Sequence, residues 1–409
     1  MALVLQTATF AHQYLNSFLY SQPKKSPDAL KLGVLSSAQI NAAAIIHPVE
    51  THPHITLYGI ASRDQNTAQS QAKKYRFKQA YGSYQALLDD PEIDVVYIST
   101  PNGQHFEWTT KAINAGKHVL CEKPFMSNGE EARKVVELAK EKGVVVEEAF
   151  HWQFHPAAHR FRAILESGEY GRILRTKALM TASPGVPEGD IRWQYDLAGG
   201  SAMDMTYALS FTRYALETSH PKHIHSVTMK PYTHDPRVDE AMYAYLTFKA
   251  SDKVGGGDVQ SQIYTDMARS WTLGIIPRFW EYPSIEVETE RAIIYFYNAM
   301  MPHLYHYISV KEKLTGRVSI CRQYAGGPVW GAYEVSVGGK GGKSGWSTYR
   351  WQLEAFVERV RGGNPPVWVG NEESVVQMEV IDQLYRAAGL PVRGERTESH
   401  GGAGEKKRE

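Results

Sequence analysis

An acid, a lysine and a proline, Glu122-Lys123-Pro124, directly follow the apolar run 117–121. The run predicts a buried strand, and proline ends such a strand because it has no N–H to give the sheet. In open parallel sheets, ligands bind beyond the carboxyl ends of the strands. A lysine at that place can exchange a proton with a bound substrate, so Lys123 is a candidate for acid–base chemistry. The alternative is an exposed Glu–Lys pair without function.

The first strand–turn–helix of the chain carries small and polar residues at its turn. A dinucleotide-binding turn has three glycines, which let the backbone approach a pyrophosphate at a helix N-terminus. Ser36, Ala38 and Asn41 occupy those three places here. Serine and alanine are small and a hydroxyl can bond phosphate, although an ordinary tight turn is the alternative. The predicted cofactor contacts of this turn are Ser36, Ser37, Ala38, Gln39 and Ile40.

The second predicted strand ends in Ala61-Ser62-Arg63-Asp64. An NAD-preferring site usually has an acid at this strand end to hold the ribose 2′-hydroxyl. Ser62 and Arg63 instead offer a hydroxyl and a guanidinium, which suit a 2′-phosphate. We therefore predict NADP(H) as the cofactor. NAD(H) stays open because Asp64 could be the ribose acid, and the remaining alternative is a solvated arginine beside a helix-capping aspartate.

The third predicted strand, 94–99, also ends in polar residues that form turns, from Thr100 through Asn102 to His105. Three successive strand ends with small or polar side chains are less expected by chance than any one of them. The sequence therefore predicts one ligand-binding edge formed by all three.

The composition of the 409 residues excludes several classes of protein. Lys+Arg number 45 and Asp+Glu 44, so the net charge of +1 gives no general attraction to nucleic acid or anionic membranes. No stretch of about 18 apolar residues predicts a membrane span. The two cysteines cannot form a disulfide framework, which favours a reducing compartment, and we expect a cytoplasmic protein.

Alternating strand and helix patterns cover residues 31–150 and predict a doubly wound parallel sheet of the Rossmann type. An arm at 1–30 precedes this dinucleotide-binding domain. After residue 150 the pattern predicts an α+β domain, 151–393, with an open and mostly antiparallel sheet. A tail at 394–409 is expected to be disordered. The predicted helices of the second domain are 156–167, 201–217, 346–362 and 371–388, and its β-rich runs are 223–232, 239–250, 258–272, 283–297 and 303–311.

The order and spacing of several short motifs resemble those of the Gfo/Idh/MocA oxidoreductases. The motifs are Thr100-Pro101-Asn102-Xaa-Xaa-His105, Glu122-Lys123-Pro124 and Glu148-Ala149-Phe150. The resemblance covers about 31–393 and is strongest to the branch of the dimeric dihydrodiol dehydrogenases and the NADP-dependent D-xylose dehydrogenases, particularly its fungal members. It implies a hydride-transferring enzyme that dimerises through its open sheet.

The resemblance also implies roles for individual residues. Lys123 would be the catalytic lysine beside the nicotinamide, Glu122 would shape the cofactor site, and Asn102 and His105 would lie against the cofactor. A second catalytic cluster is expected on helix 201–217, where Asp204 is followed by Tyr207. The family places a His or Tyr four residues after the aspartate, whereas here the tyrosine is at three. Both spacings keep two side chains on one helix face, and a nearby Lys123 would lower the pKa of the phenol; the alternative for Tyr207 is a core tyrosine.

Substrate contacts are predicted on either side of this helix. Arg192 and Trp193 precede the glycine pair, where relatives use the arginine on substrate hydroxyls and where the indole could stack on a sugar face. Gln153 stands where relatives commonly have arginine, and His151 is a further candidate, although a buried histidine and a surface arginine are the plain alternatives. None of the sixteen histidines falls in a pattern with metal-ligand spacing, and we predict no metal.

The predicted function is an NADP(H)-dependent oxidoreductase that moves a hydride between nicotinamide and a sugar, a dihydrodiol or another small alcohol or ketone. The alternatives are a biosynthetic reductase of a non-sugar ketone, an enzyme that keeps and recycles its cofactor as the NAD-dependent glycosidases of the family do, and a nicotinamide-binding regulator without turnover. The expected partners are a small-molecule substrate and a second copy of the chain, with no nucleic acid and no membrane.

Overall fold

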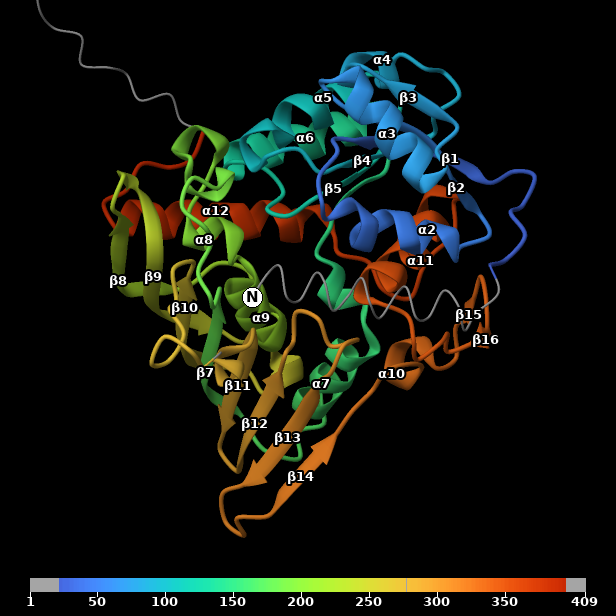
Figure 1. Ribbon diagram of the computed structural model, residues 1–409. Coiled ribbons are helices and arrows are strands. Elements are labelled where there is room, and N and C mark those ends of the chain that lie inside the picture. The colour runs from blue at the N-terminus through green and yellow to red at the C-terminus, as the bar shows by residue number, and fades with distance from the viewer. Residues whose placement is uncertain (1–21, 277, 395–409) are drawn as a thin grey trace, which may run out of the picture.

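The computed structural model describes residues 22–276 and 278–394 (Figure 1). Most of the predicted arm and all but the first residue of the predicted disordered tail lie outside the described residues. None of the helices within the described ranges combines the length and apolar character that a membrane crossing needs.

The first half of the chain forms a six-stranded parallel sheet with the order β3-β2-β1-β4-β5-β6. The Rossmann-type sheet is therefore confirmed, and its strand order reverses between β1 and β4, where open sheets of this kind bind ligands. All four residues of β4 are buried, as expected of a parallel strand covered on both faces. The strands are β1 (Leu30–Leu35), β2 (Ile55–Ala61), β3 (Gln79–Tyr81), β4 (Val95–Ile98), β5 (His118–Cys121) and β6 (Val146–Glu148).

The helices between these strands begin at side chains that cap them. Asp64 accepts hydrogen bonds from the first amides of α3, Ser83 from α4, and Asn128 from α6. The helix that follows the first turn is a short π-helix, η1, continued by α2, which has a proline in its first turn. The helices are η1 (Ala42–Ile46), α2 (His47–Glu50), α3 (Gln65–Tyr75), α4 (Tyr84–Leu88), η2 (Asn102–Gln104), α5 (His105–Asn114) and α6 (Gly129–Lys142).

The second half forms an eight-stranded sheet with the order β14-β13-β12-β11-β7-β10-β9-β8. Among the pairs of this sheet in the described residues, only β7 with β10 is parallel, so the predicted mostly antiparallel sheet is confirmed. The run predicted at 283–297 is two strands, β11 and β12, because a turn at 290–291 separates them. The strands are β7 (Ile173–Thr181), β8 (His223–Tyr232), β9 (Asp235–Lys249), β10 (Asp258–Asp266), β11 (Ser284–Thr289), β12 (Ala292–Tyr297), β13 (Tyr307–Glu312) and β14 (Val318–Cys321), and β15 (Glu334–Val335) pairs with β16 (Gly339–Lys340) apart from this sheet.

The single helix predicted at 201–217 is wrong, because two helices occupy this range. Met205 leaves the helical conformation with φ −94° and ψ 27°, directly after α8. The side-chain amide of Gln377 donates to the carbonyl of Thr206 at 3.0 Å and to its hydroxyl at 2.8 Å, which adds a tertiary contact at the break. The helices of the second half are η3 (His151–Phe154), α7 (Pro156–Glu166), η4 (Ile191–Trp193), η5 (Tyr195–Leu197), α8 (Ser201–Asp204), α9 (Tyr207–Leu216), η6 (Asp252–Val254), η7 (Phe279–Glu281), α10 (Gly327–Trp330), α11 (Thr348–Val360) and α12 (Asn371–Ala387).

Helix α11 belongs to the second half of the sequence but packs against the first sheet (Figure 1). Its residues Tyr349, Leu353 and Phe356 share one buried apolar cluster with β1 and η1. Polar contacts also cross to the first half, since Arg350 donates to the hydroxyl of Thr51 at 3.1 Å and Glu354 lies 3.3 Å from the ring of His52. The two halves are therefore joined by a helix that completes the core of the first.

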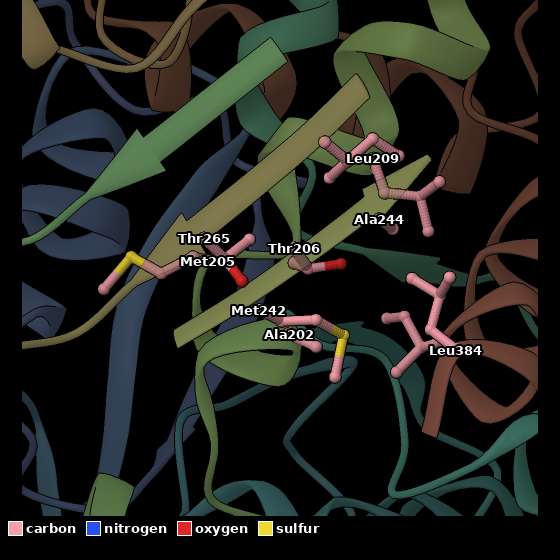
Figure 2. A pocket seen from close by; sticks show the side chains of 10 residues that line it. Ala202, Met205, Thr206, Leu209, Met242, Ala244, Thr265 and Leu384 are labelled. Carbon is pink, nitrogen blue, oxygen red and sulfur yellow. The ribbon is translucent and has the colours of Figure 1, made fainter. Parts of the chain in front are cut away.

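A small apolar cavity lies where α8 and α9 meet β9, β10 and α12 (Figure 2). Its free volume of ≈ 10 Å³ is about the least that holds a water molecule. The segment between α8 and α9 is thus incompletely packed on this side. The lining residues are Ala202, Met205, Thr206, Leu209, Met242, Ala244, Ile263, Thr265, Ile381 and Leu384.

Candidate active site

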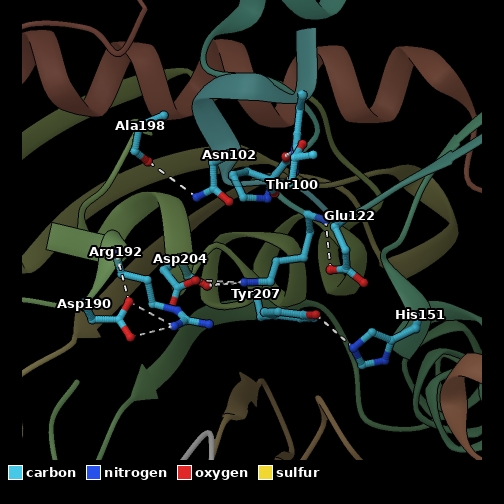
Figure 3. A network of polar contacts seen from close by, with 12 residues as sticks. Thr100, Asn102, Glu122, His151, Asp190, Arg192, Ala198, Asp204 and Tyr207 are labelled. Atoms are coloured by element: carbon cyan, nitrogen blue, oxygen red, sulfur yellow. Dashed lines mark hydrogen bonds and ion pairs between the residues drawn. The ribbon is translucent and has the colours of Figure 1, made fainter. Parts of the chain in front are cut away.

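Lys123 follows the carboxyl end of β5 and contacts Asp204 of the second half of the chain, which lies beside Arg192 in Figure 3. Its ammonium donates to the carboxylate of Asp204 at 3.1 Å and to the main-chain carbonyl of the same residue at 3.0 Å. The side chains are 18% and 12% exposed, so the pair is accessible at one side only. The structure therefore brings together the two residues from distant parts of the sequence for which acid–base chemistry was predicted.

Asp204 also contacts a second cation. Arg192 lies with its Nε 3.2 Å from the other carboxylate oxygen of Asp204, and it donates to Asp190 at 3.1 Å. Burial alone would raise the pKa of Asp204, but the charges of Lys123 and Arg192 outweigh it, so the pKa lies below its ordinary value. The carboxylate is therefore ionised at neutral pH, in a row of two cations and two anions.

Tyr207 lies beside this row, but its hydroxyl points elsewhere. The phenol oxygen is 2.9 Å from Nε2 of His151, whereas the Lys123 ammonium lies over the ring, 5.7 Å from its centroid (Figure 3). Burial, together with nearby acids, raises the pKa of Tyr207 well above its ordinary value. The net shift is therefore opposite to the lowering that the sequence predicted from Lys123, because burial of the phenol dominates. Burial also lowers the pKa of His151 to about 3, so the contact joins two neutral groups.

Glu122 turns back toward the first sheet. Tyr97 of β4 donates its hydroxyl to one oxygen of Glu122 at 2.5 Å, and the amide of Lys123 donates to the other at 3.2 Å. Sequence reasoning missed Tyr97, although a tyrosine in a buried apolar strand usually has a partner for its hydroxyl. It missed Asp190 as well, whose spacing of two from Arg192 was the available signal.

The turn after β1 has the backbone of a cofactor-binding turn without its glycines. Ser36, in the first glycine place, has a positive φ of 105°, a conformation that glycine usually supplies. Its hydroxyl bonds Ser99 at the end of β4, and Asn41 bonds both the Ser36 carbonyl and Ser99. These buried contacts hold the turn in place, and Ser37, Ala38, Gln39 and Ile40 follow it with partly exposed or exposed side chains.

The end of β2 places Ser62 and Arg63 next to each other at the same edge. Ser62 is buried, whereas Arg63 is exposed. Asp64 already accepts hydrogen bonds from the amide and the hydroxyl of Thr67, at 2.9 and 2.5 Å. The carboxylate of Asp64 is thus committed to its helix, and the guanidinium of Arg63 remains at the surface.

The end of β4 supplies the remaining predicted cofactor contacts, in two different situations. The hydroxyl of Thr100 is buried and has no hydrogen-bond partner within the described structure, and Asn102 reaches the carbonyl of Ala198 at 3.5 Å. His105 is fully buried, with its two ring nitrogens 2.9 Å from the carbonyls of Thr100 and Pro124. His105 therefore joins the two strand-end loops and does not present its ring to a ligand.

Two predicted substrate residues have their surfaces occupied by the protein. Trp193 is 5% exposed, donates to the carbonyl of Pro187 and stacks on Tyr232 at 4.3 Å, so its indole has little face left for a sugar. The amide of Gln153 donates to Glu373 and to Ser210, outside the row of charges. The structure thus places Arg192 in the row of charges, where it shares Asp204 with Lys123. Trp193 and Gln153 instead contact other parts of the protein.

Comparison with known proteins agrees with this geometry. The model of the oxidoreductase family with an NAD-binding Rossmann fold, Gfo/Idh/MocA, matches residues 31–150. A D-xylose 1-dehydrogenase (NADP⁺) of Haloferax volcanii is 32% identical over 363 residues, which cover 88% of this chain and 97% of that protein. This chain belongs to the Gfo/Idh/MocA oxidoreductases. The predicted family is confirmed.

Two further relatives show how far the likeness extends across the family. A trans-1,2-dihydrobenzene-1,2-diol dehydrogenase of Mus musculus is 29% identical over 273 residues, covering 64% of this chain and 79% of that one. The crystal structure of a 3-ketoreductase from Actinomadura kijaniata, in complex with NADP and TDP-benzene, superposes with a TM-score of 0.71 at 22% identity and covers 88% and 98% of the two chains. The branch predicted from the sequence is among these relatives. Within residues 22–276 and 278–394, no group of three or more His, Cys, Asp or Glu side chains is arranged to hold a metal ion.

Proposed function

We propose that this oxidoreductase is an NADP(H)-dependent dehydrogenase or reductase acting on the CH–OH group of a sugar, a dihydrodiol or a related small alcohol. The observation that carries the proposal is the Lys123 ammonium, which is held by Asp204 at the carboxyl edge of the parallel sheet. Support comes from relatives that are named as a D-xylose 1-dehydrogenase (NADP⁺) and as a trans-1,2-dihydrobenzene-1,2-diol dehydrogenase.

The residues at this edge fit a dinucleotide. The positive φ of Ser36 opens the first turn, and the unpartnered Thr100 hydroxyl is a buried polar atom at the next strand end. Ser36, Ser37, Ala38, Gln39, Ile40, Thr100 and Asn102 would hold the cofactor, with Glu122 behind them. A bound nicotinamide would supply or accept the hydride.

Lys123 is the proposed proton donor and acceptor at the carbinol oxygen of the substrate. Asp204 fixes the ammonium in place. Once Lys123 has given its proton to the substrate oxygen, the Asp204 carboxylate that remains still faces the positive charge of Arg192. Arg192 keeps Asp204 ionised and can contact a substrate hydroxyl. Tyr207 forms the floor below the ammonium, and its hydroxyl is a positioning contact to His151.

The preference for NADP(H) over NAD(H) rests on the end of β2. The carboxylate of Asp64 accepts hydrogen bonds from Thr67 at the start of α3, so it is not available for a ribose hydroxyl. Arg63 is exposed beside Ser62 and can pair with a 2′-phosphate.

A homodimer through the open face of the eight-stranded sheet is the proposed assembly. Exposed apolar side chains lie on strands of this sheet and next to it, among them Tyr243, Tyr305, Val318 and Ile320. Exposed apolar surface of this kind marks association sites. Light scattering after gel filtration should give twice the mass of 46.0 kDa, and a monomer at micromolar concentration would contradict the assignment.

The cytoplasm is the proposed compartment. Both cysteines are free, Cys121 on β5 and Cys321 on β14. Free thiols persist in reducing compartments. Fractionation of the producing cell tests this assignment.

The deciding experiment is a substrate panel assayed at the absorbance of reduced nicotinamide. NADP⁺ would be offered with pentoses, hexoses and dihydrodiols, and NADPH with the matching ketones, which also covers a biosynthetic ketone reductase. Turnover with any of them supports the proposal and ranks the substrates. Tight cofactor binding with no net turnover across the panel would favour a regulator or a cofactor-recycling enzyme instead.

A further inference from the structure

Arg393 and Asp239 form an ion pair that is completely buried, with 0% exposure of both side chains and a separation of 2.9 Å. Buried ion pairs are tolerated where further hydrogen bonds satisfy the remaining polar atoms. Here the guanidinium also donates to the carbonyls of Gly199 at 2.7 Å and Pro391 at 2.9 Å. The ring of Tyr385 covers it, with the guanidinium carbon 4.0 Å from the ring centroid.

The pair touches the chain between Arg192 and Asp204, the two residues of the second half that form the row of charges with Lys123. The second oxygen of Asp239 accepts from the hydroxyl of Ser201 and the amide of Ala202, both at 2.7 Å. These residues begin α8, which ends at Asp204. On the other side, Gly199 accepts from Arg393, and Gly200 donates its amide to the carbonyl of Arg192 at 3.1 Å.

The glycine pair is required for this approach. Gly200 has a φ of 136°, and a Cβ atom there would lie 2.1 Å from Asp239. A Cβ on Gly199 would lie 2.3 Å from the Arg192 carbonyl. The ion pair and the backbone of the site are therefore in direct contact, with no side chain between them.

Side-chain packing alone does not fix this segment. Ala202, Met205 and Thr206 line the small apolar cavity of Figure 2. A gap in the packing forfeits dispersion contacts on that side. The hydrogen bonds that Ser201 and Ala202 donate to Asp239 therefore contribute to the placement of α8.

We propose that the Arg393–Asp239 pair is a positioning device that holds Asp204 between Lys123 and Arg192. The two carboxylate oxygens of Asp239 contact different parts of the site. One pairs with Arg393, which donates to Gly199, and the other accepts from Ser201 and Ala202 at the start of α8. The inference rests on the proposed function only for its consequence in catalysis, since the placement of Asp204 is a property of the folded chain.

Two variants of graded severity test the proposal. Ser201→Ala removes one hydroxyl from Asp239, and Arg393→Lys keeps the charge but donates from one nitrogen, where the guanidinium uses three nitrogens to reach its three acceptors. Arg350→Lys is the matched control, because Arg350 belongs to a comparable buried ion pair with Glu354 and contacts none of the site residues. Far-UV circular dichroism and thermal unfolding of all three variants show whether they are folded.

The kinetic readout is the pH profile of kcat together with the KM for NADPH. The charged and titratable groups that face Asp204 are Lys123 and Arg192, with Asp190, Glu122 and Tyr207 behind them. If Asp204 is displaced, the charges of Lys123 and Arg192 stabilise its carboxylate less, and its pKa rises. The acid limb of the pH profile should therefore move upward by about 0.5 to 1 pH unit. We expect kcat to fall about tenfold in Arg393→Lys and less in Ser201→Ala, with KM for NADPH within about twofold of the wild type.

A second readout needs no turnover. Acetylation of Lys123 by a limiting acylating reagent, measured by peptide mass spectrometry, should be about twofold or more faster in both variants, because the ammonium loses acceptors that hold it. Faster acetylation in Arg350→Lys, or unchanged acetylation in Arg393→Lys, would overturn the inference. A wild-type protein without turnover would instead count against the proposed function, while the acetylation rates would still decide the role of the pair.

Discussion

Replacing Asp204 by asparagine tests the row of charges most directly. The wild-type carboxylate accepts from Lys123 at 3.1 Å and faces the Nε of Arg192 at 3.2 Å. Asparagine has nearly the same shape, but it carries no charge and only one acceptor oxygen. If that oxygen serves Lys123, the amide group of asparagine meets the N–H of Arg192, donor against donor.

The expected loss in rate follows from this geometry. Positioned acid–base groups contribute about 10²–10⁴-fold. We expect the lower end, about 10²-fold in kcat or about 2.7 kcal/mol in the barrier, because the main-chain carbonyl of residue 204 still holds Lys123. KM for NADPH should stay within about twofold, since the proposed cofactor contacts lie at the ends of β1, β2 and β4.

The difference in stability between the wild type and the variant should depend on pH. Asp204 has a lowered pKa in the folded protein, so its stabilisation is present above the unfolded pKa of about 3.9 and is lost as pH falls through the folded value. Removing one partner of a buried ion pair costs about 3–5 kcal/mol. The Asp204, Lys123 and Arg192 side chains are 12%, 18% and 34% exposed, and we therefore expect a smaller loss of about 1–2 kcal/mol at pH 7.

The assay compares Asp204→Asn with Asp190→Asn by steady-state kinetics and by urea unfolding at pH 7 and pH 3. Asp190 is the matched control, because it also pairs with Arg192 but does not touch Lys123. Its variant should lose less than about fivefold in kcat. The reasoning is refuted if Asp204→Asn retains a kcat within about twofold of the wild type, or if the control loses as much.

Three further predictions concern single residues of the site. Lys123→Met should bind NADP⁺ normally in a fluorescence titration but lose about 10²-fold or more in kcat, and near-normal rates would remove Lys123 from the mechanism. Arg63→Ala should raise the Kd for NADP⁺ about tenfold or more and leave that for NAD⁺ within about twofold, whereas equal losses would contradict a 2′-phosphate contact. Tyr207→Phe should cost about 1–3 kcal/mol of stability, because a buried nitrogen of His151 loses its partner, but less than about tenfold in kcat; a loss equal to that of Lys123→Met would make the phenol the acid.

The sequence was sufficient for the sheet and for the central residues of the site. Parallel strands are covered on both faces, so their apolar runs and polar ends can be read from the sequence, and this placed Lys123 at a ligand-binding edge. The motif order identified the family, and with it the pairing of Lys123 with Asp204 across 81 positions.

Details that depend on packing could not be read in this way. Tyr207 and Asp204 were expected on one helix face, but the helix is interrupted at Met205. Gln377, which donates to Thr206 at this interruption, belongs to the distant helix α12. The spacing of residues in the sequence does not show which aromatic rings are covered by other side chains in the folded protein. The sequence therefore predicts Trp193 as a sugar-stacking residue, whereas in the structure its indole stacks on Tyr232.

The position of α11 has a consequence for how the protein is made. The last strand of the first sheet ends at Glu148, and the helix that completes its core begins only at Thr348. At about 5–20 residues per second, a ribosome needs some 10–40 seconds to synthesise the stretch between them. During that time the apolar surface that α11 later covers is exposed on the nascent first half, and chaperones can bind it. A gene fragment that ends after the first sheet should therefore yield insoluble protein.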